Sequence, residues 1–238
     1  MGHLLLSVAG SGGAQKHSSP PDELQQLARA CADRLGADVR PTRVAASSGD
    51  VDAALATLTD GARLLLDVDL AGLQLVLARL LRAGRLGEVE TSVFPREPIG
   101  YLTRLGLPGG RAGRPGQLDA VARPARLIGV VKDDSGGVCV DHAELGPWTG
   151  GSSWWVRAVV DDERLVDGTA TAVTMTRLGP SELEATVRLG RLRRRTVRGR
   201  SLQLACDEAL ITQDGVDRER PRSKRTLWSE PELWRCTI

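Results

Sequence analysis

The sequence is poor in aromatic residues, which are 3% of its 238 residues: five Trp, one Tyr and one Phe. Proteins that bind single-stranded nucleic acid stack bases on aromatic side chains, so this class of protein is disfavoured. Positive charge is not in excess either, because 32 basic and 30 acidic residues leave a net charge of +2. A neutral surface does not attract phosphate backbones. We therefore expect no nucleic-acid partner.

Metal-binding side chains are also scarce. The three histidines, His3, His17 and His142, lie too far apart in the sequence to form a pair of metal ligands. The four cysteines are too widely spaced for a CxxC pair, and they stand at positions 31, 139, 206 and 236. We expect no metal site of this kind, and we expect free, buried thiols in a reducing compartment.

Long apolar runs are missing. No stretch approaches the roughly 18 consecutive apolar residues that a membrane helix needs. The first residues, MGHLLLSVAG, lack the basic start and long apolar stretch of a signal peptide. We expect a cytoplasmic protein.

The first hundred residues alternate short apolar runs with amphipathic segments. The alternation predicts strands at 3–9, 38–45, 62–68 and 89–94, and helices at 22–36, 49–60 and 70–83. Such an order is typical of a parallel sheet covered by helices, whose ligands bind at the carboxyl ends of the strands. We therefore expect an α/β domain over residues 1–108.

The second half differs from the first in composition and in its pattern of apolar residues. A Gly, Pro and Arg stretch at 107–117 predicts a loop or a domain boundary. Short β-rich segments follow at 125–132, 137–142, 154–160, 169–176, 183–189, 195–205 and 207–213. Turn sequences such as Asp167-Gly168 and Asp214-Gly215 separate them. We expect an antiparallel, sandwich-like domain over 109–238, with a last strand that could return to the first domain.

Two places in the α/β half carry residues suited to phosphate or metal. The Gly10–Gly13 cluster follows a strand and precedes a helix, where backbone amides could hold a phosphate. Its spacing fits neither common phosphate-loop motif, so an ordinary turn is the alternative. Asp67 and Asp69 end a strand, where they could hold Mg²⁺ or accept a proton. The alternative for these carboxylates is a cap for the following helix.

A run of arginines is the main local excess of positive charge. Its members stand at positions 191, 193, 194, 195, 198 and 200. Alternate residues of a strand share a face, so the run could form a basic stripe for phosphate or for an anionic surface. The alternative is a solvated face balanced by Glu182 and Glu184.

The order of these segments resembles the diacylglycerol kinase and sphingosine kinase family of lipid kinases along nearly the whole chain. LLLSVAGSGG (4–13) is similar to the family's opening strand and Asn-Pro-x-Ser-Gly loop. ARLLLDVDLAGLQLVLARLL is similar to its strand, Gly-Gly-Asp-Gly-Thr loop and helix. QDGVDRERP through LWRCTI is similar to the closing hairpin, whose Asp-Gly-Glu supplies the family's proposed base.

The resemblance implies a nucleotide-binding α/β domain followed by a β-rich domain, with ATP and Mg²⁺ as cofactors and a lipid hydroxyl as acceptor. It assigns nucleotide contacts to Ser11, Gly12, Gly13, Asp67 and Gly72, and catalytic roles to Asp69 and Asp214. It also implies a lipid or other apolar small molecule as partner. A homodimer and peripheral contact with the inner face of the membrane are compatible with it.

The sequence departs from the family at the residues that carry the chemistry. Val68, Leu70 and Ala71 replace loop residues of the family, and glycine's wide conformational range is lost there. Val216 replaces the Glu of Asp-Gly-Glu and cannot accept a proton from a lipid hydroxyl. We therefore expect a divergent and even inactive site.

Three functions stay open on the sequence alone. The first is an ATP-dependent lipid kinase with a divergent site. The second is a non-catalytic pseudokinase that binds a lipid or a nucleotide, or that acts as a partner protein. The third is a different acid/base enzyme on the same scaffold, which would use Asp67, Asp69 and Glu97.

Overall fold

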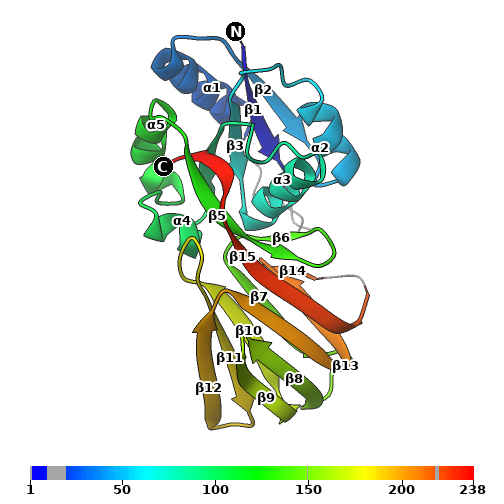
Figure 1. Ribbon diagram of the computed structural model, residues 1–238. Coiled ribbons are helices and arrows are strands. Elements are labelled where there is room, and N and C mark those ends of the chain that lie inside the picture. Colours follow the sequence, from blue (N-terminus) through cyan, green and yellow to red (C-terminus); the bar gives the residue numbers. More distant parts are fainter. Residues whose placement is uncertain (1, 10–19, 149, 218–219) are drawn as a thin grey trace. The chain divides into compact units, whose positions relative to one another are not determined.

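The structure of this chain is a computed structural model, and it describes residues 2–9, 20–148, 150–217 and 220–238 (Figure 1). The chain forms two compact units. The first contains Met1–Ile128 and Glu232–Ile238, and the second contains Gly129–Pro231. The expected domain boundary at 108/109 stays a prediction.

The first unit contains a parallel sheet. Its strands are β1 (His3–Val8), β2 (Val39–Val44), β3 (Leu64–Val68) and β4 (Thr91–Pro95). They lie in the order β2-β1-β3-β4, and every pair is parallel. The end of β15 (Arg222–Thr237) adds a parallel strand beside β4, where Cys236 lies opposite Thr91. The α/β fold class with a parallel sheet is therefore confirmed.

Helices cover this sheet. They are α1 (Pro21–Leu35), α2 (Ser48–Leu55), α3 (Leu70–Arg82), α4 (Gly100–Arg104) and α5 (Arg114–Val121), with a 3₁₀ turn at Arg111–Gly113. Helices α1 and α5 pack together over Leu5, Leu65 and Phe94 on one face (Figure 1). Helices α2 and α3 pack against each other, and α3 contacts β3.

Local sequence signals explain where α1 and α2 begin and end. Helix α1 has proline in its first turn, and Gly36 ends it with a left-handed φ of 61°. Ser47 caps α2 by accepting a hydrogen bond from the amide of Asp50. Helix α2 ends at Leu55 and is shorter than the predicted 49–60, and the Thr57 hydroxyl beyond it donates to the carbonyl of Ala54.

Two helices depart from the expectation for residues 96–121. The 107–117 stretch was predicted to be a loop, yet α5 begins inside it at Arg114. Proline in the first turn of α5 is compatible with a helix, because the first backbone amides have no partner within the helix. Helix α4 has five residues, which is too short to show a helical period.

The second unit is antiparallel. Its strands are β5 (Arg126–Asp133), which begins in the first unit, β6 (Val138–Cys139), β7 (His142–Pro147), β8 (Trp154–Val160), β9 (Glu163–Ala170), β10 (Ala172–Arg177), β11 (Leu183–Leu189), β12 (Arg193–Gly199), β13 (Ser201–Gln213), β14 (Val216–Asp217) and most of β15. The order β12-β11-β10-β7-β13 forms one layer. The long strand β13 also pairs with β8 through residues 202–206. Strands β8 and β9 pair with each other and form the second layer. Buried residues of the two layers enclose one apolar core, which confirms the sandwich-like class.

Some strand boundaries differ from those predicted. Asp167-Gly168 was predicted to be a turn, but both residues lie inside β9 opposite Arg157 and Val156 of β8. The turn stands at Asp161, whose φ is 50°. The predicted strand 137–142 is divided into β6 and β7, and the predicted strand 195–205 is divided between β12 and β13.

Among the described residues, no helix is long and apolar enough to cross a membrane.

Candidate functional site

Polar side chains gather at the carboxyl edge of the parallel sheet. Ser7 near the end of β1 donates to the Asp67 carboxylate on β3 at 3.2 Å. Arg96, the residue after β4, contacts this carboxylate through Nη2 at 3.0 Å and the Ser7 hydroxyl at 2.8 Å. Its Nη1 also donates to the carbonyl of Val8 at 2.7 Å. Arg96 therefore ties together the ends of three neighbouring strands, where an α/β sheet usually holds its ligand.

A second arginine approaches the same carboxylate from a helix. Arg114 is the first residue of α5, and its Nη2 lies 2.8 Å from Oδ1 of Asp67. The Arg114 guanidinium also stands 5.5 Å from the centre of the Phe94 ring, at a distance typical of a cation–π contact. Its Nη1 is buried and has no hydrogen-bond partner among the described residues. We call Ser7, Asp67, Arg96 and Arg114 the arginine site.

The arginine site has an excess of positive charge. Asp67 is fully buried, while the Arg96 and Arg114 side chains are 10% and 24% exposed. Burial alone would raise the pKa of the Asp67 carboxyl, but Arg96 and Arg114 outweigh it and hold this pKa below its ordinary value. Among the described residues, two guanidinium groups thus face one carboxylate, which leaves an excess of one positive charge.

The start of α3 is closed by a side chain of the protein itself. Strand β3 ends at Val68 and α3 begins at Leu70, so that only Asp69 stands between them. The Asp69 carboxylate caps the helix by accepting a 2.7 Å hydrogen bond from the amide of Gly72. A Cβ on Gly72 would lie 3.1 Å from Oδ1 of Asp69 and 3.3 Å from Cβ of Val8. The first turn of α3 is therefore tightly packed, and its amide-rich end already holds a negative charge.

Asp214 has a structural environment in the second unit. With a φ of 51° it opens the turn between β13 and β14, and Gly215 follows with a φ of 79°. Its buried carboxylate accepts hydrogen bonds from the amides of Val140, Asp141 and His142 at 2.5, 2.9 and 3.0 Å. Burial raises the pKa of the Asp214 carboxyl, and these three amides counteract the rise. The side chain thereby holds the turn between β6 and β7.

The structure brings only some of the expected site residues together. Asp67 and Asp69 lie at the same sheet edge but bond to different partners. Glu97, the third carboxylate of the acid/base alternative, is exposed. Ser11, Gly12 and Gly13 lie outside the described residues. The roles assigned to all these residues stay predictions.

Sequence reasoning did not find the two arginines of the arginine site. Arg96 and Arg114 stand 29 and 47 positions from Asp67 in the chain. Neither belongs to a motif or to a periodic run. The only signal in the sequence was the position of Arg96 directly after a predicted strand, because the carboxyl ends of neighbouring parallel strands meet at one edge of the sheet.

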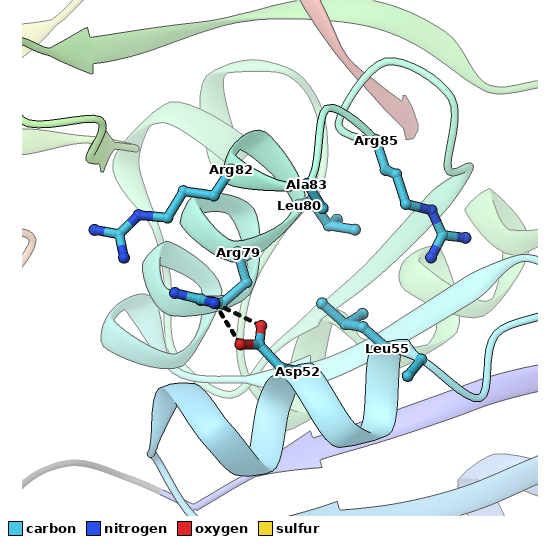
Figure 2. Close-up of a pocket in the computed structure, with 8 residues that line it drawn as sticks. Asp52, Leu55, Arg79, Leu80, Arg82, Ala83 and Arg85 are labelled. Carbon is cyan, nitrogen blue, oxygen red and sulfur yellow. Dashed lines mark hydrogen bonds and ion pairs between the residues drawn. The ribbon is translucent and has the colours of Figure 1, made fainter.

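A pocket of about 350 Å³ lies between α2 and α3, away from this edge (Figure 2). In its wall Asp52 forms an ion pair with Arg79, with Nε 2.6 Å from Oδ1. Arg79 and Arg82 belong to the last turn of α3, where cations stabilise the negative end of the helix. These contacts explain Asp52, Arg79 and Arg82 without a ligand.

Solved structures share the architecture of this chain. No family model and no curated protein matches its sequence. A diacylglycerol kinase from Bacillus anthracis has a TM-score of 0.69 at 13% identity, over 99% of this chain and 96% of that one. An NAD kinase from Archaeoglobus fulgidus in complex with ATP has a TM-score of 0.64 at 10% identity, over 100% and 94% of the two chains. The chain has the fold of these kinases. The resemblance to lipid kinases is thus confirmed for the fold, and identities this low show nothing finer.

The residues at α3 do not fit Mg·ATP in the way this kinase fold implies. Asp69 matches the Asp of the Gly-Gly-Asp-Gly-Thr loop, and its carboxylate accepts a hydrogen bond from the Gly72 amide, so the misfit lies in its neighbours. Val68 is fully buried where a glycine would let backbone amides approach the phosphates.

Proposed function

We propose that this protein is a non-catalytic protein of the lipid-kinase fold, which binds a phosphate-bearing ligand at the arginine site and transfers no phosphoryl group. The loss of the loop glycines at Val68 and Leu70 carries the proposal. Phosphoryl transfer depends on positioning phosphates and on neutralising their charge, and side chains at these two positions restrict the backbone conformations that bring amides close to a phosphate.

The positions of the other candidate carboxylates support the loss of transfer. Asp214 is 2% exposed and its oxygens accept three backbone amides, so it has little access to an acceptor hydroxyl. Val216 beside it cannot act as a base. Asp67 is held as an ionised partner of two arginines and is fully buried. Asp67 and Asp214 therefore stabilise the fold, and we assign neither of them a catalytic role.

The arginine site supports the binding half of the proposal. It offers one positive charge more than its carboxylate neutralises, and the Arg114 side chain is 24% exposed, so a ligand can reach it. Arginine forms strong, charge-assisted hydrogen bonds with phosphate oxygens. A phosphate group at the exposed part of Arg114 would supply the missing negative charge. The phosphate could belong to a nucleotide or to a phosphorylated lipid.

Thermal unfolding of the full chain with ATP, pyrophosphate or short-chain phosphatidic acid tests this proposal. A ligand at a hundred times its Kd stabilises the native state by about 2.7 kcal/mol, which is a measurable rise in the melting temperature. We expect at least one probe to produce the rise without Mg²⁺. Arg114→Gln should abolish the rise, whereas Asp69→Ala should keep it.

The opposite pattern would favour a working kinase. In that case the rise with ATP would require Mg²⁺ and would disappear in Asp69→Ala. A rise with none of the three probes would overturn the binding half of the proposal. Transfer of labelled phosphate from ATP to a short-chain diacylglycerol would overturn its non-catalytic half.

A further inference from the structure

The hairpin of β11 and β12 carries unpaired positive charge at its tip. Residues 190–192 form the loop, and Arg188 of β11 lies directly opposite Arg194 of β12. Like charges in opposite positions destabilise an antiparallel pair. Arg191 and Arg193 add two further exposed cations. None of these four arginines forms an ion pair within the described part of the chain.

Arginines further along β12 behave differently. The Arg195 guanidinium lies 3.0 Å from the Glu163 carboxylate, and Arg198 lies 2.9 Å from Glu184. Glu184 thus neutralises an arginine within β12. The alternative of a solvated face balanced by acidic residues expects this pairing. The excess charge is confined to the tip of the hairpin.

An apolar side chain stands among the four cations. Leu192, in the loop, is 96% exposed, so it contributes nothing to the core of the second unit. Beside it is a hollow of about 720 Å³, which the hydroxyl residues Ser152 and Thr171 help to line. The four tip arginines line the same hollow. Folding explains neither the exposed leucine nor the opposed arginines.

We propose that this hairpin tip docks on a bilayer that contains anionic lipids. Leu192 would enter the boundary between headgroups and acyl chains, and the four arginines would contact lipid phosphates, with one headgroup in the hollow. Peripheral proteins combine apolar and basic residues on one surface in this way. Each arginine near an anionic surface strengthens binding about fivefold.

The observations favour a membrane over a nucleic acid. A fully exposed leucine gains nothing beside a phosphate backbone, but it gains by leaving water at a bilayer. Among the described residues that line the hollow, none is aromatic, so bases would find no stacking surface. The net charge of +2 also leaves the attraction local to the tip.

Co-sedimentation with vesicles tests the proposal. The full chain is mixed with vesicles of phosphatidylcholine alone, or of phosphatidylcholine with phosphatidylglycerol. We expect binding only to the anionic vesicles, and weaker binding at high salt. Arg191→Gln with Arg194→Gln should weaken it about 25-fold. Leu192→Ser should weaken it with all charges of the tip unchanged.

A matched control removes the same number of charges from the same hairpin. Arg195→Gln with Arg198→Gln alters the arginines that Glu163 and Glu184 already neutralise, and we expect a change of less than about threefold. Circular dichroism checks that each variant is folded. Equal losses in the two double variants would overturn the proposal, as would unchanged binding in Arg191→Gln with Arg194→Gln. Binding to single-stranded RNA but not to vesicles would also overturn it. The proposed ligand of the arginine site is measured without vesicles, so the two proposals can fail separately.

Discussion

Asp67→Asn should destabilise the first unit strongly. The change removes the carboxylate that faces Arg96 and Arg114, at distances of 3.0 and 2.8 Å. Both guanidinium groups would stay partly buried without this counter-ion. Breaking a buried ion pair costs about 3–5 kcal/mol. Because Arg114 is 24% exposed and water screens its charge, we expect a value near the lower end, about 3 kcal/mol.

Hydrogen exchange measured by mass spectrometry reports this loss where it occurs. Amides of β1 and β3 should lose protection by about the same 3 kcal/mol in Asp67→Asn, and amides of the second unit should change little. The thermal midpoint should fall by about 6–12 °C, at 2–4 °C for each kcal/mol.

Asp119→Asn is the matched control. Asp119 pairs with Arg34 at 2.7 Å, but both side chains are more than half exposed, at 54% and 51%. Exposed pairs contribute about 0–1 kcal/mol. A loss of stability below about 1 kcal/mol for Asp67→Asn as well would refute the structural role of this carboxylate, because removing a buried counter-ion destabilises a protein by several kcal/mol.

Three further predictions concern the other carboxylates and pH. The lowered pKa of Asp67 means that its stabilisation is complete above the unfolded value of 3.8 and is lost as the pH falls through the folded value. Acid unfolding followed by circular dichroism should therefore be less steep in Asp67→Asn. Asp214→Ala leaves three backbone amides without their acceptor and should cost about 3 kcal/mol or more in urea unfolding, whereas a cost near zero would contradict the assigned contacts. Asp69→Ala removes a helix cap and should cost about 1 kcal/mol in the same assay, and a gain in stability would contradict the capping role.

The α/β half could be predicted closely because local signals and burial agree there. Strands β1 and β3 each contain a run of three leucines, 4–6 and 64–66, as is typical of strands covered on both faces. The apolar spacing of α1 and α3 matches their buried residues. Helix α5 could not be predicted, since a Pro-Gly pair at its start is also typical of a loop and its packing against α1 and β4 decides.

The candidate site was only half predictable. Capping by Asp69 and the turn at Asp214-Gly215 were readable, because both follow from residue type and local position. The arginine site depends on contacts between residues that lie far apart in the sequence, and Arg114 reaches Asp67 only because α5 exists. No spacing rule gives such a contact. Sequence patterns therefore located the edge of the sheet, but they did not predict the two arginines that make this edge positively charged.

Phosphoryl transfer by the purified full chain tests the central claim most directly. Labelled Mg·ATP is incubated with a short-chain diacylglycerol, and both lipid phosphate and released inorganic phosphate are measured, with Asp69→Ala and Asp214→Asn as controls. The account predicts that neither product exceeds the protein-free blank, while ATP or another of the phosphate probes still raises the melting temperature through Arg114. Product that forms with the natural chain and disappears in Asp69→Ala would contradict the account.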